Sequence, residues 1–427
     1  MADPSADRSS IAVDNLRAVI ILLVLAFHSS LAYLAFLPNH PFAFGQPPFT
    51  WRAFPIVDAH RFLGFDLFCA WLDVFLMSLF FMLSGLFAWP SLSRKGARAF
   101  LSDRLLRIGL PFAVIVGLWI PLALYPSYAQ SAADPTFAGY VAAWRGLPFW
   151  PAGPMWFLWL LLAWDLGAAG LHAVLRGRRD LVLRLSCWAR EHPVRFLAGV
   201  LAASAVTYVP LALAFGSSPW VQLGPLPLQL SRPTHYAVYF FAGLAIGACG
   251  IERGLLAPRG WLARHWRRWL VAAPLSFLLW ISLTALVRSR GDAAPLGLQA
   301  ADDVSFVIAC LAGCGLALAS AIQFGRVRAP LLDSLKANAY GMYLIHYLFV
   351  VWLQYTLLPA DLPGLVKGVL VFAATLIASW GATALLRRVP AVADIVGSGR
   401  RRPAPRPLSA PAPRGGSGGL ASRSAGD

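Results

Sequence analysis

Long apolar segments alternate with short polar, Pro-rich or Arg-rich segments along almost the whole chain. Ten of the apolar segments approach or exceed the roughly 18 to 20 residues that an α-helix needs to cross a bilayer. They are expected at residues 11–36, 66–89, 108–125, 155–175, 196–215, 235–249, 269–287, 304–324, 338–357 and 364–386. This pattern predicts an all-α polytopic membrane protein with about ten transmembrane helices.

The two ends of the chain differ from this apolar core. The first ten residues are polar, and the apolar run that follows is too long for a removed signal peptide and lacks a small-residue cleavage site. We therefore expect residues 1–10 to form a short cytoplasmic segment and residues 11–388 to form one transmembrane domain. Residues 398–427 mix Pro, Gly, Ser, Ala and Arg, which predicts a disordered cytoplasmic tail with some affinity for anionic lipid.

Composition agrees with a membrane protein and excludes a soluble enzyme, because 58% of the 427 residues are hydrophobic and only 13% are charged. The net charge of +17 would suggest a nucleic-acid partner in a soluble chain. Here, however, 28 of the 36 basic residues fall in the two ends and in every second loop. This asymmetry predicts that both termini are cytoplasmic and that no nucleic acid is bound. The use of Arg in preference to Lys is typical of a GC-rich bacterial genome.

The sequence offers little support for a disulfide framework or a metal site. Its five cysteines are few and scattered. Cys310 and Cys314 would lie one helical turn apart, but no third ligand is nearby, so packing explains them better than metal binding. No HExxH, CxxC or Walker-type motif occurs. We expect no bound metal and no permanently bound cofactor.

Ionisable side chains inside the apolar segments are costly and are therefore candidates for function. These residues are Asp14, Arg17, His28, Asp73, Asp165 and His346. Ten residues separate Arg17 from His28, and eleven helical steps of about 100° return to the same face of a helix. The two side chains would thus share one stripe, about 16 Å apart along the axis, with Arg17 near the cytoplasmic headgroups.

Each of these two residues suits one part of a transfer reaction. The guanidinium of Arg17 can bind phosphate oxygens in pairs and stays charged. The imidazole of His28 can accept and then donate a proton. Taken singly, Arg17 could instead extend to the membrane interface, and His28 could form an interhelical hydrogen bond.

Several motifs in order along the chain resemble the acyltransferase-3 family of integral membrane O-acyltransferases. The first is the Arg17–His28 spacing. The others are Phe80-Phe81-Met82-Leu83-Ser84-Gly85, Arg104-Leu105-Leu106-Arg107, Met155-Trp156-Phe157-Leu158 and Ala339-Tyr340-Gly341-Met342-Tyr343-Leu344-Ile345-His346. The resemblance extends from about Ala12 to Arg388 and is greatest to the branch that includes the glucan succinyltransferase of osmoregulated periplasmic glucans.

This resemblance implies a multi-pass enzyme of the bacterial cytoplasmic (inner) membrane. Such an enzyme transfers an acyl group, for example acetyl or succinyl, from cytoplasmic acyl-CoA to a hydroxyl of an extracytoplasmic glycan or glycolipid. Arg17, Arg104 and Arg107 would then bind the donor, although Arg104 and Arg107 also fit a purely topological positive-inside signal. The partners expected are acyl-CoA, the glycan acceptor and membrane lipid.

The resemblance also implies that His28 is the catalytic residue. It either acts as general base on the acceptor hydroxyl or attacks the thioester directly to give an acyl-histidine. Ser29 and Ser30 point about 100° and 200° away from His28 on the helix, which argues against a serine nucleophile activated by it.

The remaining candidates have supporting or substrate-binding roles. Asp14, Asp73, Ser84, Trp156, Tyr343 and His346 form this group. His346 would orient a substrate or a proton with Tyr343 as its partner, or form a structural bond. Asp73 and Asp66, seven residues apart on one helix face, would orient His28 or bind sugar hydroxyls, and Asp165 is expected to pair with a basic group. His235, at the start of its helix, is expected at the outer face, where it would anchor the helix at the interface or contact the acceptor.

Two other classes of function remain open from the residues alone. Ten helices with intramembrane Arg, His and Asp also suit a transporter of a small solute or glycan precursor. A non-catalytic scaffold would tolerate apolar replacements at these ionisable positions.

Overall fold

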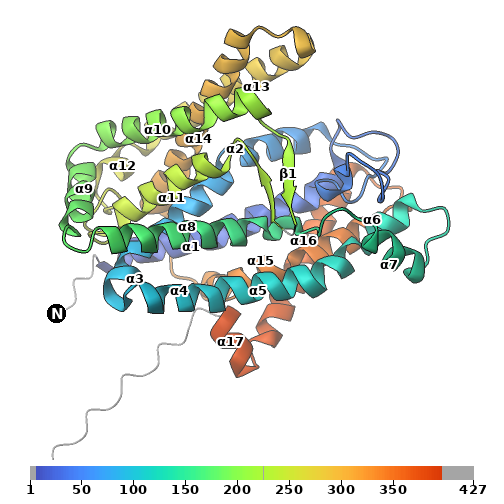
Figure 1. Cartoon of the computed structure of the whole chain (residues 1–427), viewed down its shortest axis with the longest axis horizontal. Coiled ribbons are helices and arrows are strands. Elements are labelled where there is room, and N and C mark those ends of the chain that lie inside the picture. The colour runs from blue at the N-terminus through green and yellow to red at the C-terminus, as the bar shows by residue number, and fades with distance from the viewer. Residues whose placement is uncertain (1–5, 225, 397–427) are drawn as a thin grey trace, which may run out of the picture.

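The computed structural model describes residues 6–224 and 226–396, and it is 76% helical with almost no sheet (Figure 1). The expected tail at 398–427 and the first five residues lie outside these described ranges. The long helices run side by side along the long axis of the molecule. The helices are α1 (Ala6–Ser30), α2 (Leu63–Gly85), α3 (Ala88–Lys95), α4 (Ala97–Arg104), α5 (Leu110–Val114), α6 (Ile120–Ser131), α7 (Phe137–Arg145), α8 (Trp156–Val174), α9 (Asp180–Glu191), α10 (Pro193–Phe215), α11 (Pro233–Gly247), α12 (Trp261–Arg264), α13 (Trp266–Arg290), α14 (Leu296–Phe324), α15 (Pro330–Thr356), α16 (Gly364–Leu386) and α17 (Pro390–Val396).

All ten expected apolar segments are helical, and within the described residues eight helical segments are long and apolar enough to cross a membrane. The two that are not among these eight are α11, which has only 15 residues, and α15, whose apolar residues are interspersed with Asn, Tyr, His and Gln. Both nevertheless belong to the bundle, because α11 packs along α2 and α15 packs along α1 and α16. The chain is a polytopic all-α membrane protein.

The third expected helix is longer than the sequence pattern indicated, extending from Ala97 to Ser131. Two π-helical turns, Leu105–Gly109 and Ile115–Trp119, interrupt it. Each turn lies just before a proline, Pro111 or Pro121. A proline cannot donate to the carbonyl four residues earlier and its ring crowds that carbonyl, so a local π turn lets the helix continue.

Helices α2 and α11 approach each other closely through glycines. A Cβ at Gly85 would lie 2.0 Å from the carbonyl oxygen of Phe240, and a Cβ at Gly243 would lie 2.0 Å from that of Met82. A Cβ at Gly247 would likewise lie 2.0 Å from the carbonyl oxygen of Leu86. Small residues four apart allow such backbone contact between membrane helices. The contact explains how the short α11 is held in the bundle.

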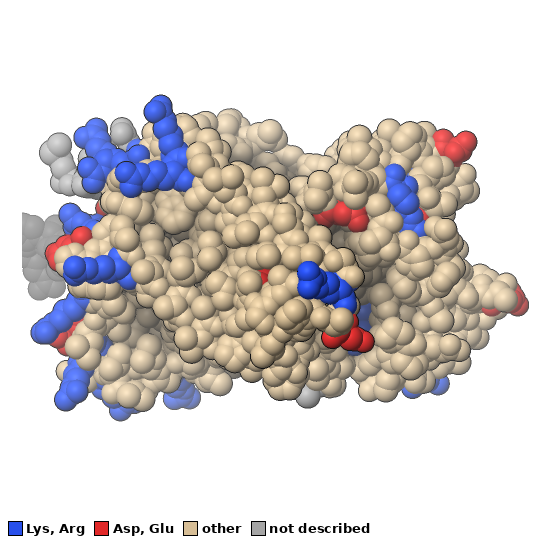
Figure 2. All heavy atoms as spheres, turned by 90° about the horizontal axis from the view of Figure 1, so that it is seen from above, with Lys and Arg blue, Asp and Glu red and all other residues tan. Residues whose placement is uncertain are grey.

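The two ends of the bundle are chemically different. Lys and Arg gather at the end where α3, α9 and α12 lie, which we call the basic end (Figures 1 and 2). At the opposite end, the segment after α1 packs against the segment around α7. There Phe44 stacks on Trp51 at 4.3 Å between ring centroids, and Gln130 hydrogen-bonds to both the backbone N–H and the carbonyl of Val57.

The structure also contains elements that the apolar pattern did not predict. An antiparallel hairpin, β1 (Trp220–Leu223) and β2 (Leu226–Gln229), precedes α11, and Trp220 pairs with Gln229. Helix α9 lies across the basic end of the bundle (Figure 1). It buries Val182, Ser186 and Ala189, while Leu181, Leu185 and other apolar residues remain exposed.

Candidate active site

Two histidines from helices distant in sequence face each other inside the bundle. Nδ1 of His28, in the last turn of α1, lies 3.4 Å from Nε2 of His346 on α15. Their ring centroids are 5.0 Å apart. The helices α1 and α15 pack directly on each other, and this contact brings together residues separated by 318 positions.

The hydrogen-bond partners fix which nitrogen of each ring carries the proton. Nδ1 of His28 lies 2.8 Å from the carbonyl oxygen of Val24, and Nδ1 of His346 lies 2.6 Å from that of Tyr343. A carbonyl only accepts, so in the neutral rings both Nδ1 atoms donate. Nε2 of His346 is then free to accept from His28, and Nε2 of His28 retains a lone pair with no hydrogen-bond partner among the described residues.

The surroundings hold the His28 ring in place without sealing it. His346 is completely buried, whereas His28 is only partly buried. The ring of Tyr347 meets that of His28 edge to face at 5.6 Å. The side chain of Gln354 donates to the carbonyl oxygens of His28 at 2.9 Å and of Ser29 at 3.2 Å. A rigid imidazole with an accessible, unprotonated nitrogen suits proton transfer.

The neighbouring serines do not take part in this arrangement. The hydroxyl of Ser29 donates to Leu25 O and that of Ser30 donates to Ala26 O, each at 2.8 Å. Both are buried within their own helix and bond one turn back. Neither serine hydrogen-bonds to His28, as the helical spacing predicts.

Arg17 lies on the same uninterrupted helix as His28, near the basic end. Its side chain is exposed, with the guanidinium carbon 5.2 Å from the ring centroid of Phe87. Its main electrostatic neighbours are Asp14, one turn earlier and partly buried, and Arg104. An exposed guanidinium held over an aromatic ring, with a second one nearby, is a suitable site for phosphate.

The second arginine motif divides into two environments. Nε of Arg104 lies 3.2 Å from the buried carboxylate of Asp165, and this contact confirms the prediction that Asp165 pairs with a basic group. Arg107 is exposed, and its backbone carbonyl accepts a 2.6 Å hydrogen bond from the hydroxyl of Tyr340. Arg104 is thus fixed by the bundle while Arg107 is left to solvent or a ligand.

The aromatic motif residues meet beside the histidine pair. Phe80 packs 4.7 Å from Phe157 and 6.3 Å from Tyr343, measured between ring centroids. Tyr343 is in turn 5.9 Å from His346. The hydroxyl of Tyr343 donates to the carbonyl of Pro154 at 2.7 Å. Tyr343 therefore hydrogen-bonds to His346 through its backbone carbonyl and not through its hydroxyl.

The other two motif residues have structural contacts. Ser84 donates to the carbonyl of Phe80, one turn back on α2, at 2.9 Å. Trp156 stacks on Tyr236 at 5.9 Å and meets Trp220 of the hairpin edge to face at 5.6 Å. Trp156 therefore joins α8, α11 and the hairpin near the start of α8.

The structure pairs Asp73 with a residue other than His28. Both carboxylate oxygens of Asp73 bond to Arg232, at 2.9 and 2.7 Å. Asp66 accepts instead from the backbone N–H of Ala35 and of Phe36. Neither acid contacts the His28 imidazole. Burial differs across the pair, since the Arg232 side chain is 7% exposed and that of Asp73 is 43% exposed.

His235 does not lie at the outer interface, where its position at a helix start predicted it. It is completely buried, with Nδ1 2.7 Å from Ser204 Oγ and Nε2 3.2 Å from Ser78 Oγ. Cys310 Sγ is 3.5 Å from the same Nε2. The expectation failed because α11 begins inside the bundle, with the hairpin segment before it. Cys314 is also buried, against the carbonyl of Phe75.

Sequence reasoning missed two further features of this half of the molecule. One is Lys367, near the start of α16, which is fully buried and donates to Asp58 Oδ2 at 2.8 Å. His60 joins this pair, with Nδ1 3.2 Å from Asp58. The other is Gln354, which lies eleven residues after Tyr343. This spacing, which also relates Arg17 and His28, places Gln354 and Tyr343 on the same face of α15 and could have identified Gln354.

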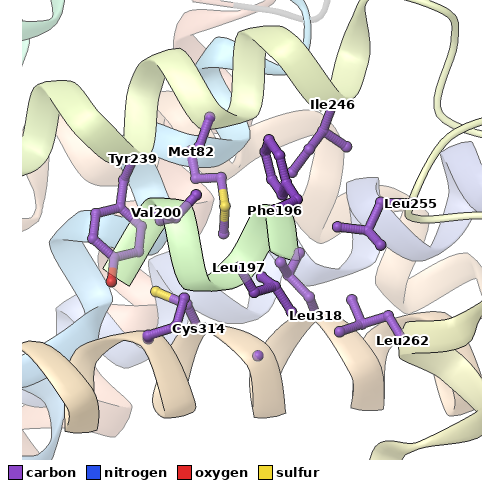
Figure 3. Close-up of a pocket in the computed structure, with 13 residues that line it drawn as sticks. Met82, Phe196, Leu197, Val200, Tyr239, Ile246, Leu255, Leu262, Cys314 and Leu318 are labelled. Atoms are coloured by element: carbon purple, nitrogen blue, oxygen red, sulfur yellow. The ribbon is translucent and has the colours of Figure 1, made fainter. Parts of the chain in front are cut away.

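A small cavity of about 20 Å³ lies between α2, α10, α11 and α14 (Figure 3). Its walls are mainly aliphatic, with Tyr239 and Cys314 at one end. Neither His28 nor His346 lines it. Such a volume has room for about one water molecule, which an apolar site does not bind well. We therefore do not place the reaction here.

Residues 10–384 match the acyltransferase-3 family model, which is described as an acyltransferase domain. The chain belongs to this family. The match spans nearly the whole chain and includes every motif residue discussed above. No curated protein and no solved structure matches the chain at a significant level. The protein is thus a multi-pass membrane acyltransferase of the acyltransferase-3 family, and its histidine pair is the candidate catalytic centre.

Proposed function

We propose that the protein transfers an acyl group, acetyl or succinyl, from acyl-CoA to a hydroxyl of an extracytoplasmic glycan or glycolipid, with His28 as general base. The proposal places the protein in the bacterial inner membrane with the basic end and both termini in the cytoplasm. The observation that carries it is the unpaired Nε2 of the partly buried His28, whose Nδ1 is held by Val24 and faces His346.

In this mechanism, His28 Nε2 accepts the proton of the acceptor hydroxyl while the oxygen attacks the thioester carbonyl. The tetrahedral intermediate then expels the coenzyme A thiolate. The imidazolium of His28 returns its proton to that thiolate, so the ring ends neutral. General base catalysis of this kind is worth roughly 10²- to 10⁴-fold in rate. The neutral His346 supports the charged ring by accepting from its Nδ1–H.

The donor would bind from the basic end, where Arg17 is exposed and Arg104 is fixed by Asp165. Arg107 adds an exposed guanidinium three residues after Arg104. Coenzyme A carries phosphates, which guanidinium groups bind through paired hydrogen bonds. The acceptor would approach from the opposite end. The roughly 16 Å of helix between Arg17 and His28 is a distance that an extended pantetheine arm is able to cover.

The test is transfer of label from radioactive acetyl- or succinyl-CoA to membrane or periplasmic glycan by the purified full-length protein. We expect wild type to label glycan and His28→Ala to lose at least about 10²-fold in activity. His40→Ala is the matched control, because His40 is an exposed histidine whose side chain contacts only the carbonyl of Pro41 among the described residues. Equal labelling by wild type and His28→Ala would remove His28 from the mechanism.

Two further readouts distinguish the alternatives. Label that stays on denatured protein when no acceptor is added, and that His28→Ala abolishes, would indicate an acyl-histidine intermediate in place of general base catalysis. Solute flux down a gradient without consumption of either donor would favour a transporter and contradict the proposal.

A further inference from the structure

A second basic site lies at the basic end, in a groove of about 670 Å³ between the α9–α10 junction, α12 and the segment after α14. Four arginines line it, namely Arg190, Arg259, Arg264 and Arg326. Glu191 is the one carboxylate among the lining residues, and Trp261 supplies an aromatic wall. Four guanidinium groups facing one carboxylate make the groove a site for an anion.

Backbone contacts fix two of the four guanidinium groups. Arg190 donates to the carbonyl of Arg253 at 3.2 Å, and Arg326 donates to that of Pro258 at 2.6 Å. Arg259 and Arg264 are exposed, and their guanidinium groups have no hydrogen-bond or ion-pair partner among the described residues. The groove thus combines two positioned charges with two that remain available for a ligand.

This groove is separate from the proposed donor site. The side chain of Asn15 donates to the carbonyls of Gly325 and Val327, which places the Arg326 segment against α1. Residues 15 and 17 of a helix point about 200° apart. The groove therefore lies on the side of α1 that faces away from Arg17.

Apolar side chains next to the groove are exposed on the surface of the bundle. Val194, next to the groove residue Pro193, is 60% exposed. Helix α9, which ends at the groove, lies across the bundle end with Leu181, Leu185 and Trp188 exposed. An in-plane helix with exposed apolar side chains and nearby arginines is typical of the membrane–water interface. A ligand bound in this groove would contact basic side chains and lipid acyl chains at the same depth in the membrane.

We propose that this groove binds the headgroup of an anionic phospholipid. The phosphodiester would be held by Arg259 and Arg264, with Arg190 and Arg326 behind them and the acyl chains along the exposed face of α10. A basic pocket between helices on the cytoplasmic side suits such headgroups. The proposal does not depend on the acyl-transfer reaction, because the groove lies apart from His28 and Arg17.

The test is lipid binding by the full-length protein in phosphatidylcholine nanodiscs that contain increasing phosphatidylglycerol, measured by native mass spectrometry. We expect the double variant Arg259→Gln/Arg264→Gln to bind phosphatidylglycerol about tenfold more weakly than wild type. The reason is that each basic side chain near the membrane surface contributes to the free energy of binding an anionic headgroup. Arg176→Gln/Arg178→Gln is the matched control, because these are also two exposed arginines at the basic end but do not line the groove.

Three outcomes would overturn the proposal. The groove variant and the control could lose equal affinity, which would mean nonspecific attraction to the basic end. The groove variant could bind phosphatidylglycerol like wild type. Adenosine 3′,5′-bisphosphate could displace the lipid from wild type, which would assign the groove to a soluble nucleotide. Retention of the thermal unfolding midpoint by the groove variant would show that it is folded, as expected for two exposed side chains.

Discussion

Nε2 of His346 lies 3.4 Å from Nδ1 of His28, and the hydrogen-bond pattern makes His346 the acceptor in this pair. The buried ring on α15 thus orients the accessible ring on α1. His346 does not need to touch either substrate to affect the rate. His346 is therefore a positioning residue for His28.

Replacement of His346 by Ala is expected to lower kcat because Nδ1–H of His28 would lose one of its two acceptors. A lost hydrogen bond to a group that becomes charged costs about 1–3 kcal/mol, which corresponds to roughly 5- to 150-fold in rate. His346→Gln, whose amide oxygen can accept, should recover part of this loss. Steady-state rates of coenzyme A release with a thiol reagent measure the effect. If both variants had wild-type kcat, His346 would have only a packing role.

A second prediction concerns Arg17 and the acyl-CoA donor. Arg17→Gln should raise KM for acyl-CoA with little change in kcat, because phosphate binding far from the reacting carbonyl is the same in the ground state and the transition state. A hydrogen bond between charged groups is worth about 1.5–3 kcal/mol, so KM should rise roughly 10- to 150-fold. The control is Arg94→Gln, another exposed arginine at the basic end. A fall in kcat at unchanged KM would contradict a donor-binding role.

A third prediction uses the unequal burial of the Asp73–Arg232 pair. Asp73→Ala leaves the buried guanidinium of Arg232 without its carboxylate, whereas Arg232→Met leaves a carboxylate that water already reaches. Removing one partner of a buried pair costs about 3–5 kcal/mol, and the partial exposure of Asp73 puts this case at the lower limit. We expect Asp73→Ala to be the more destabilising change. Unfolding by SDS in mixed micelles compares the two, and the reverse order would contradict this assignment.

The pattern of apolar residues was sufficient to predict the ten main helices, because membrane-spanning segments must be long and apolar. It did not predict α9 or the hairpin before α11, which are amphipathic or short. It also identified His28, Arg17 and His346 as candidates, because ionisable residues are conspicuous in apolar segments. Their partners were harder to predict, since contacts such as Asp73 with Arg232 and Asp58 with Lys367 join residues 159 and 309 positions apart.

The failure at His235 has the same origin. Nothing local distinguishes a histidine at a helix start on the surface from one that begins a helix inside the bundle. Its burial depends on Ser78 of α2 and Ser204 of α10, and on how deep α11 sits. That depth is set by the glycine contact between α2 and α11.

The fourth prediction tests this glycine contact. In Gly243→Ala, the new Cβ would lie 2.0 Å from the carbonyl oxygen of Met82, so α11 must move away from α2. Overpacking of a close-packed contact costs about 1–3 kcal/mol. Because the contact holds α11 in the bundle, the same shift would carry His235 and Tyr236 away from their partners on α2.

Gly170→Ala provides the matched control, because Gly170 is also in a helix and a Cβ there would meet no atom within 4 Å. That change should be neutral or slightly stabilising, since alanine favours a helix more than glycine does. SDS unfolding of both variants measures the difference. If Gly243→Ala were as stable as Gly170→Ala, then the α2–α11 contact could not be as close as the structure shows, and the depth of α11 would need another explanation.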